Sequence, residues 1–69
     1  MTKILDLKAS DVVRHALASR VEQITDHGTE VGMTWVDCNG YVESGYFPHD
    51  MEFKLLGWDA ETWNEFRKL

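Results

Sequence analysis

The sequence predicts a small α+β domain, in which two helices pack on one face of a three-stranded antiparallel sheet in the order α-β-β-β-α. Apolar residues recur at helical spacing early in the chain, and an Asn-Gly pair separates two alternating runs in the middle. Near the end, an acid between two tryptophans can cap a closing helix. The apolar residues within 3–7 leave room for a short N-terminal strand. Because a chain of this length supplies one core only, residues 1–69 are expected to form a single acidic domain.

The first helix is expected to begin near Ser10 or Asp11, where a capping side chain and an early acid suit the exposed amides of a helix N-terminus. The apolar stripe of this helix consists of Val13, Ala16, Leu17, Val21 and Ile24. Gly28 is the predicted stop, because glycine readily adopts the backbone conformation that ends helices. The pattern therefore predicts one amphipathic helix with its apolar stripe against the sheet.

A hairpin is expected over residues 30–47. Apolar and polar residues alternate in this segment, which is the period of a half-buried strand. Asn39 and Gly40 lie between the two alternating runs, and this pair is among the strongest signals for a tight hairpin turn.

Two registers of this hairpin are compatible with the sequence. A two-residue turn places Val42 and Tyr46 on the face that carries Trp35, and we favour this pairing. A type I turn with a glycine bulge instead brings Tyr41 and Phe47 to the Trp35 face. The two pairings differ in which aromatic side chains enter the core.

Two further elements follow Pro48, which ends the second strand. Apolar and charged residues alternate over residues 51–55 and predict a third strand. Asp59 is placed to cap a closing helix, with Trp58 and Trp63 at the two positions of a hydrophobic staple. The side chains of this helix that are expected to face inward are Trp63, Phe66 and Leu69.

Charge is unevenly distributed along the chain, whose net charge is -5. The segment 21–53 contains no Lys or Arg. Its acidic residues are Glu22, Asp26, Glu30, Asp37, Glu43, Asp50 and Glu52. The hairpin is therefore an acidic element. Such charge commonly serves only to keep a small protein soluble and to protect exposed sheet edges.

A more specific hypothesis than solubility is that the chain is a non-enzymatic protein-binding module, which docks its acidic hairpin onto a basic surface of a partner protein. Negative charge would accelerate the encounter, and exposed aromatic residues would supply contact area. The expected contact residues are Glu30, Asp37, Tyr41, Glu43, Asp50 and Glu52. In size and charge the chain is similar to the small acidic inhibitors that phages and mobile elements direct against nucleases or CRISPR complexes, some of which act as nucleic-acid mimics. This likeness concerns only size and charge, and no sequence motif supports it.

Two alternative functions predict different surfaces. A structural homodimer or accessory subunit would pair sheets or exposed aromatic residues between copies. A small enzyme would bring His49 together with a carboxylate in a concave pocket.

Composition excludes several other classes. Seven cationic residues are too few for direct nucleic-acid binding, which depends on neutralising phosphates. One cysteine, Cys38, and three scattered histidines lack the paired spacing of a metal site, and no glycine-rich phosphate loop indicates a cofactor. A single cysteine also excludes an internal disulfide. With neither a signal-peptide pattern nor an apolar run near the roughly 20 residues of a membrane span, we expect a cytoplasmic protein without a membrane partner.

Overall fold

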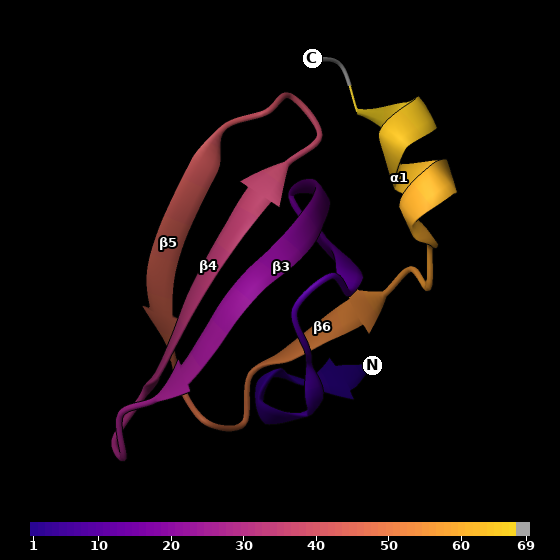
Figure 1. Cartoon of the computed structure of the whole chain (residues 1–69). Coiled ribbons are helices and arrows are strands. Elements are labelled where there is room, and N and C mark those ends of the chain that lie inside the picture. The colour runs from indigo at the N-terminus through magenta and orange to yellow at the C-terminus, as the bar shows by residue number, and fades with distance from the viewer. Residues whose placement is uncertain (68–69) are drawn as a thin grey trace.

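The computed structural model describes residues 1–67, which form one antiparallel sheet with a short helix at its C-terminal end (Figure 1). The strands are β1 (Thr2–Lys3), β2 (Val12–His15), β3 (Leu17–Asp26), β4 (Val31–Asp37), β5 (Val42–Phe47) and β6 (Glu52–Leu55). A 3-10 turn, η1 (Ile4–Asp6), follows β1, and the α-helix is α1 (Ala60–Phe66). Across the sheet the strands follow the order β1-β6-β2-β3-β4-β5. The predicted α-β-β-β-α order with a three-stranded sheet is therefore wrong.

The segment predicted as the first helix is the β2–β3 hairpin, which turns at Ala16 with a φ of 62°. The error has a specific cause in β3. Its pairing with β4 shifts between Val21 and Gln23, so Glu22 is the extra residue of a bulge. The bulge returns Ile24 to the face of Val21, three residues away. A spacing of three, which normally indicates a helix, is thus produced by a bulged strand.

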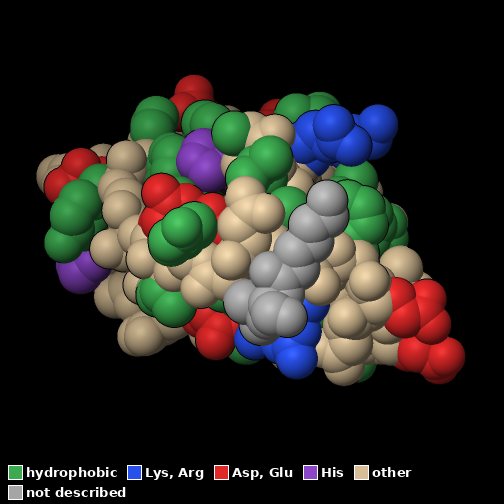
Figure 2. Space-filling view, turned by 90° about the horizontal axis from the view of Figure 1, so that it is seen from above, with side chains coloured by type: hydrophobic (Ala, Val, Ile, Leu, Met, Phe, Trp, Pro, Cys, Tyr) green, Lys and Arg blue, Asp and Glu red, His purple; other side chains and the backbone are tan. Residues whose placement is uncertain are grey.

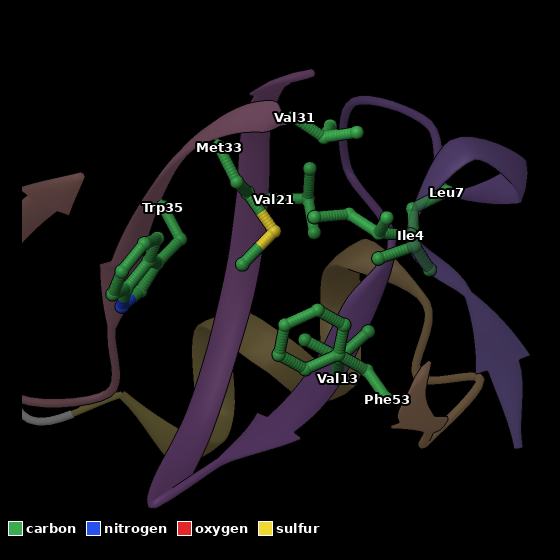
Figure 3. Close-up of a cluster of buried hydrophobic side chains, with 8 residues drawn as sticks. All are labelled: Ile4, Leu7, Val13, Val21, Val31, Met33, Trp35 and Phe53. Carbon is green, nitrogen blue, oxygen red and sulfur yellow. The ribbon is translucent and has the colours of Figure 1, made fainter. Parts of the chain in front are cut away.

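The inner face of the sheet carries the larger core (Figure 3). Its buried side chains are Ile4, Leu7, Val13, Val21, Val31, Met33, Trp35 and Phe53. The sheet curls around this core, because Phe47 of β5 lies 5.4 Å from Phe53 of β6, ring centre to ring centre, although three strands separate β5 from β6. In a flat sheet the two strands would be about 19 Å apart.

A second core lies on the other face, where α1 packs. It contains Val12, Ala18, Cys38 and Trp63. The predicted helix cap is confirmed, because the Asp59 carboxylate accepts a hydrogen bond of 2.8 Å from the Thr62 backbone N–H. Trp63 faces inward as predicted, with 1% of its surface exposed, but Phe66 is 48% exposed. Leu69 lies outside the described residues.

The predicted hairpin is present as β4 and β5, but the favoured register is wrong. Val31 pairs with Phe47 and Trp35 pairs with Glu43, so Phe47 joins the Trp35 face and Val42 lies on the opposite face. The type I turn with a glycine bulge is the pairing that forms. It has the Gly40 N–H bonded to the Asp37 carbonyl at 3.0 Å, and a φ of 91° at Gly40.

The remaining elements agree more closely with the sequence. The predicted third strand is β6, which lies between β1 and β2 in the sheet. The short strand suggested within residues 3–7 is shifted toward the N-terminus: β1 covers Thr2–Lys3, and Ile4–Asp6 forms η1 instead. No helix among residues 1–67 is both long and apolar enough to cross a membrane.

Replacing Trp63 by alanine is expected to lower the free energy of unfolding by about 3–5 kcal/mol, because the change leaves a cavity between α1 and the sheet. Urea denaturation followed by circular dichroism measures this loss. Phe66→Ala is the matched control on the same helix and should cost much less, since Phe66 is half-exposed. Equal losses in the two variants would show that α1 does not depend on the buried indole.

Candidate functional site

The Asp37 carboxylate belongs to the hairpin turn and not to an outward surface. Only 7% of Asp37 is exposed. Its Oδ1 accepts hydrogen bonds from the backbone N–H groups of Asn39 (2.9 Å) and Tyr41 (3.1 Å). The Asp37 N–H in turn donates to the Tyr41 carbonyl at 3.0 Å. Asp37 therefore positions the residues around it.

The turn is also fixed to the neighbouring strand. The Cys38 N–H donates to the Ala18 carbonyl of β3 at 3.0 Å, and Cys38 is buried in the smaller core. Tyr41 follows the turn directly and is 68% exposed. An anchored backbone thus presents an aromatic side chain to solvent.

Glu43 lies close to Tyr41 in the hairpin. It is exposed, and its pairing with Trp35 places it on the inner face of the sheet at the end strand β5. Tyr41 continues the same ladder two residues earlier, so the two side chains lie on the same side of the hairpin. The structure therefore brings together Asp37, Tyr41 and Glu43 of the expected contact residues.

The other three expected contact residues lie elsewhere. Glu30 is in the β3–β4 turn and Asp50 in the β5–β6 loop, which are both at the bottom of Figure 1, whereas the β4–β5 turn is at the top. Glu52 is on β6, where it pairs with Lys3 of β1. The six expected contact residues therefore lie in three separate places: the β4–β5 turn and the start of β5, the opposite end of the sheet, and strand β6.

Two further acids of the segment 21–53 have cationic or histidine partners. Glu22 accepts a bond of 2.9 Å from Arg20, and Asp26 lies 2.7 Å from His49 Nε2. Figure 2, which views the molecule from the top of Figure 1, shows acidic side chains in several separate places with Lys and Arg side chains between them. On this side of the molecule, negative charge is dispersed.

The Asp26–His49 contact joins the end of β3 to the β5–β6 loop. The hydrogen bond from His49 is the main cause that lowers the pKa of Asp26 below its ordinary value of 3.8, and the Gly28 backbone N–H adds to the effect. Both side chains are partly exposed. Residues 1–67 enclose no pocket beside this pair and contain no His/Cys/Asp/Glu cluster suited to a metal ion. The enzyme alternative requires a contact of this kind inside a concave pocket, and the described residues provide the contact without the pocket.

The outer side of β5 is a feature that sequence reasoning did not single out. Val42 and Tyr46 are 70% and 66% exposed. Their neighbours across β4 are Val36 and Gly32, and Thr34 lies opposite Ser44 between them. An uncharged surface with two large side chains therefore lies along the end strand of the sheet.

Removing the Asp37 carboxylate with Asp37→Ala is expected to lower the free energy of unfolding by about 1–3 kcal/mol, because two turn N–H groups lose their acceptor. Urea denaturation checks this value. Asp50→Ala, which removes an acid from an exposed turn, should change stability by less than about 0.5 kcal/mol. A similar loss in both variants would contradict the structural role of Asp37.

The Asp26–His49 contact predicts a pH dependence. Because folding lowers the pKa of Asp26, the contact stabilises the fold above the pH at which the unfolded carboxyl ionises, near pH 4, and this contribution is lost as pH falls through the folded pKa. In a carboxyl titration followed by NMR, His49→Ala should move the Asp26 pKa upward toward 3.8. His27→Ala should move it less, because the charge of His27 is the weakest of the causes. An unmoved Asp26 titration in His49→Ala would show that the contact does not form in solution.

The geometry thus provides two surfaces on one hairpin. Tyr41 and Glu43 lie on one side of it, held by the Asp37 turn, and Val42 and Tyr46 lie on the other. Comparison of the chain with protein-family models, with curated proteins and with solved structures finds no match.

Proposed function

We propose that the chain is a non-enzymatic protein-binding module that contacts its partner through Tyr41 and Glu43 at the β4–β5 turn. The observation that carries this proposal is the exposure of Tyr41, 68%, on a backbone held by the Asp37 carboxylate. Tyrosine is enriched in protein interfaces, where it supplies contact area at a low entropic cost.

Rigidity of the turn supports this role. Three hydrogen bonds to Asp37 and the bond from Cys38 to β3 define the backbone before any partner arrives. A surface that is already ordered loses little conformational entropy on binding, so more of the contact energy contributes to affinity.

Charge supports a partner with a basic surface. Glu43 is exposed and makes no ion pair with another residue of the range 1–67, and the chain has a net charge of -5. A carboxylate beside an exposed phenol ring suits an arginine or lysine, because the cation pairs with the acid and lies against the ring face. The proposed partner is therefore a protein with a basic surface.

We do not extend this role to imitation of a nucleic acid. A phosphate backbone is an extended and regular row of negative charges. Glu30 and Asp50 lie at the end of the sheet opposite Glu43, and Glu52 pairs with Lys3. Only a local contact is proposed, with Glu43 as its charged residue.

The test is affinity capture from a lysate of the organism that encodes the chain, with the wild type, Tyr41→Ala and Glu43→Lys as baits. A partner that the wild type retains should be lost or strongly reduced with each variant, and its capture should weaken at high salt, because screening reduces attraction between exposed charges. Quantitative mass spectrometry measures the retained amount.

Glu30→Lys is the matched control. It makes the same charge change as Glu43→Lys on the same hairpin, but at the opposite end. Capture by Glu30→Lys should equal that of the wild type. If Glu30→Lys loses the partner as completely as Glu43→Lys does, only net charge matters and the proposed surface is rejected.

A further inference from the structure

The two edges of the sheet differ in how they are protected. The edge strand β1 has two residues, Thr2 and Lys3, and short strands with a lysine are a common protection against pairing with other chains. The other edge is β5, a regular strand of six residues without lysine, proline or bulge. Figure 1 shows no strand on its outer side. An edge of this kind can pair with another strand.

The pairing with β4 determines which backbone groups of β5 face outward. The bond from the Asp37 N–H to the Tyr41 carbonyl sets the phase of the ladder, in which bonded and non-bonded pairs alternate. The N–H and C=O groups of Val42, Ser44 and Tyr46 therefore point away from β4. Within residues 1–67, no backbone bond outside the sheet ladders involves these three residues.

The side chains of the same three residues form an uncharged strip. Val42, Ser44 and Tyr46 are all exposed, on the face opposite Trp35. Tyr46 is already positioned, because its ring lies across Gly32 and 5.6 Å from the ring of His27. A strand that pairs with this edge would meet an uncharged strip in which the Tyr46 ring is already positioned.

We propose that a second copy of this chain docks on β5, antiparallel, around a two-fold axis at Ser44. This register places Ser44 opposite Ser44 of the other copy, and Val42 opposite Tyr46 of the other copy. It uses all six outward backbone groups of each strand in bonded pairs. It also places each exposed valine against a tyrosine, and such pairs of β-branched and aromatic residues stabilise sheets. The two sheets become one continuous sheet with an isologous interface.

This register minimises the charge repulsion between two copies. Each chain has a net charge of -5, so two copies repel wherever their acids meet. On β5 the only acid is Glu43, and the register places it opposite Gly45 of the other copy, which has no side chain. The two Glu43 side chains are then diagonal neighbours, about 7–8 Å apart. Their repulsion is screened by salt, so the dimer should become tighter as salt rises.

The dimer does not depend on the proposed function, although it would double the Glu43 surface. Partner binding and self-association have opposite salt dependences: binding to a basic partner weakens as salt rises, and self-association strengthens. A wild type that dimerises but captures no partner would reject only the protein-binding role. A wild type that captures a partner but stays monomeric would reject only the docking at β5.

Sedimentation equilibrium of the full chain at several concentrations tests the dimer. The wild type should approach twice the chain mass of 8.0 kDa. Ser44→Lys and Ser44→Glu each place like charges directly opposite at the two-fold axis, so the dissociation constant of each should rise about fivefold or more. An equal mixture of the two variants places lysine opposite glutamate and should restore the dimer. Circular dichroism of each variant confirms that the fold is retained.

Gln23→Lys is the matched control, because it adds the same charge to the same face on β3, two strands from the edge. It should dimerise like the wild type. A monomeric wild type at all concentrations would overturn the proposal and leave the edge to a strand of another protein. Equal weakening by Gln23→Lys and Ser44→Lys, or failure of the mixture to associate, would also overturn it.

Discussion

The contact between Phe47 and Phe53 is the constraint on which the rest of the structure depends. These rings belong to strands separated by three others in the sheet, yet they pack edge to face with centres 5.4 Å apart. His15 packs edge to face against both rings and against Trp35, at 4.9–5.6 Å between ring centres. Such contacts require a strongly curled sheet. The bulge at Glu22 provides part of the curl, because bulges bend a strand and increase its twist.

Curling decides which surfaces the molecule has. A chain of 69 residues gives a flat six-stranded sheet too little material to cover both faces. Here the inner face covers itself, and α1 with Trp63 covers the outer face over β2 and the start of β3. On the outer side of β5, Val42 and Tyr46 remain largely exposed. These two side chains are exposed because α1 covers a different part of the outer face.

The sequence predicted the elements whose signals are local. The Asn39–Gly40 turn, the alternation in β4 and β6, and the Asp59 cap all depend on residues within a few positions of one another. It failed over residues 10–26, where a bulge gave β3 the three-residue spacing of a helix. The bulge forms because β3 pairs with β4, which is a non-local contact. No local sequence pattern could therefore distinguish a helix from a bulged strand in this segment.

The candidate site could be predicted only in part, for the same reason. Tyr41 and Glu43 were found from composition and from their place in the hairpin. The buried role of Asp37 depends on the register, which its own hydrogen bonds to the turn fix. Val42 and Tyr46 required the strand order, because only the order makes β5 an edge. Once that order is known, the absence of Lys and Pro from β5 is a readable signal in the sequence.

The distribution of charge connects the two proposed surfaces. Acidic residues lie in each strand from β3 to β6, in the loops and in α1, so two copies repel at most orientations. The outer strip of β5 is a place where the chain can meet itself without opposing carboxylates. Tyr41 and Glu43 lie on the other face of that hairpin, because successive residues of a strand point to opposite sides. Pairing through the β5 backbone therefore leaves the Glu43 carboxylate on the face proposed for a basic partner. Glu43 of the other copy is its diagonal neighbour across the dimer interface.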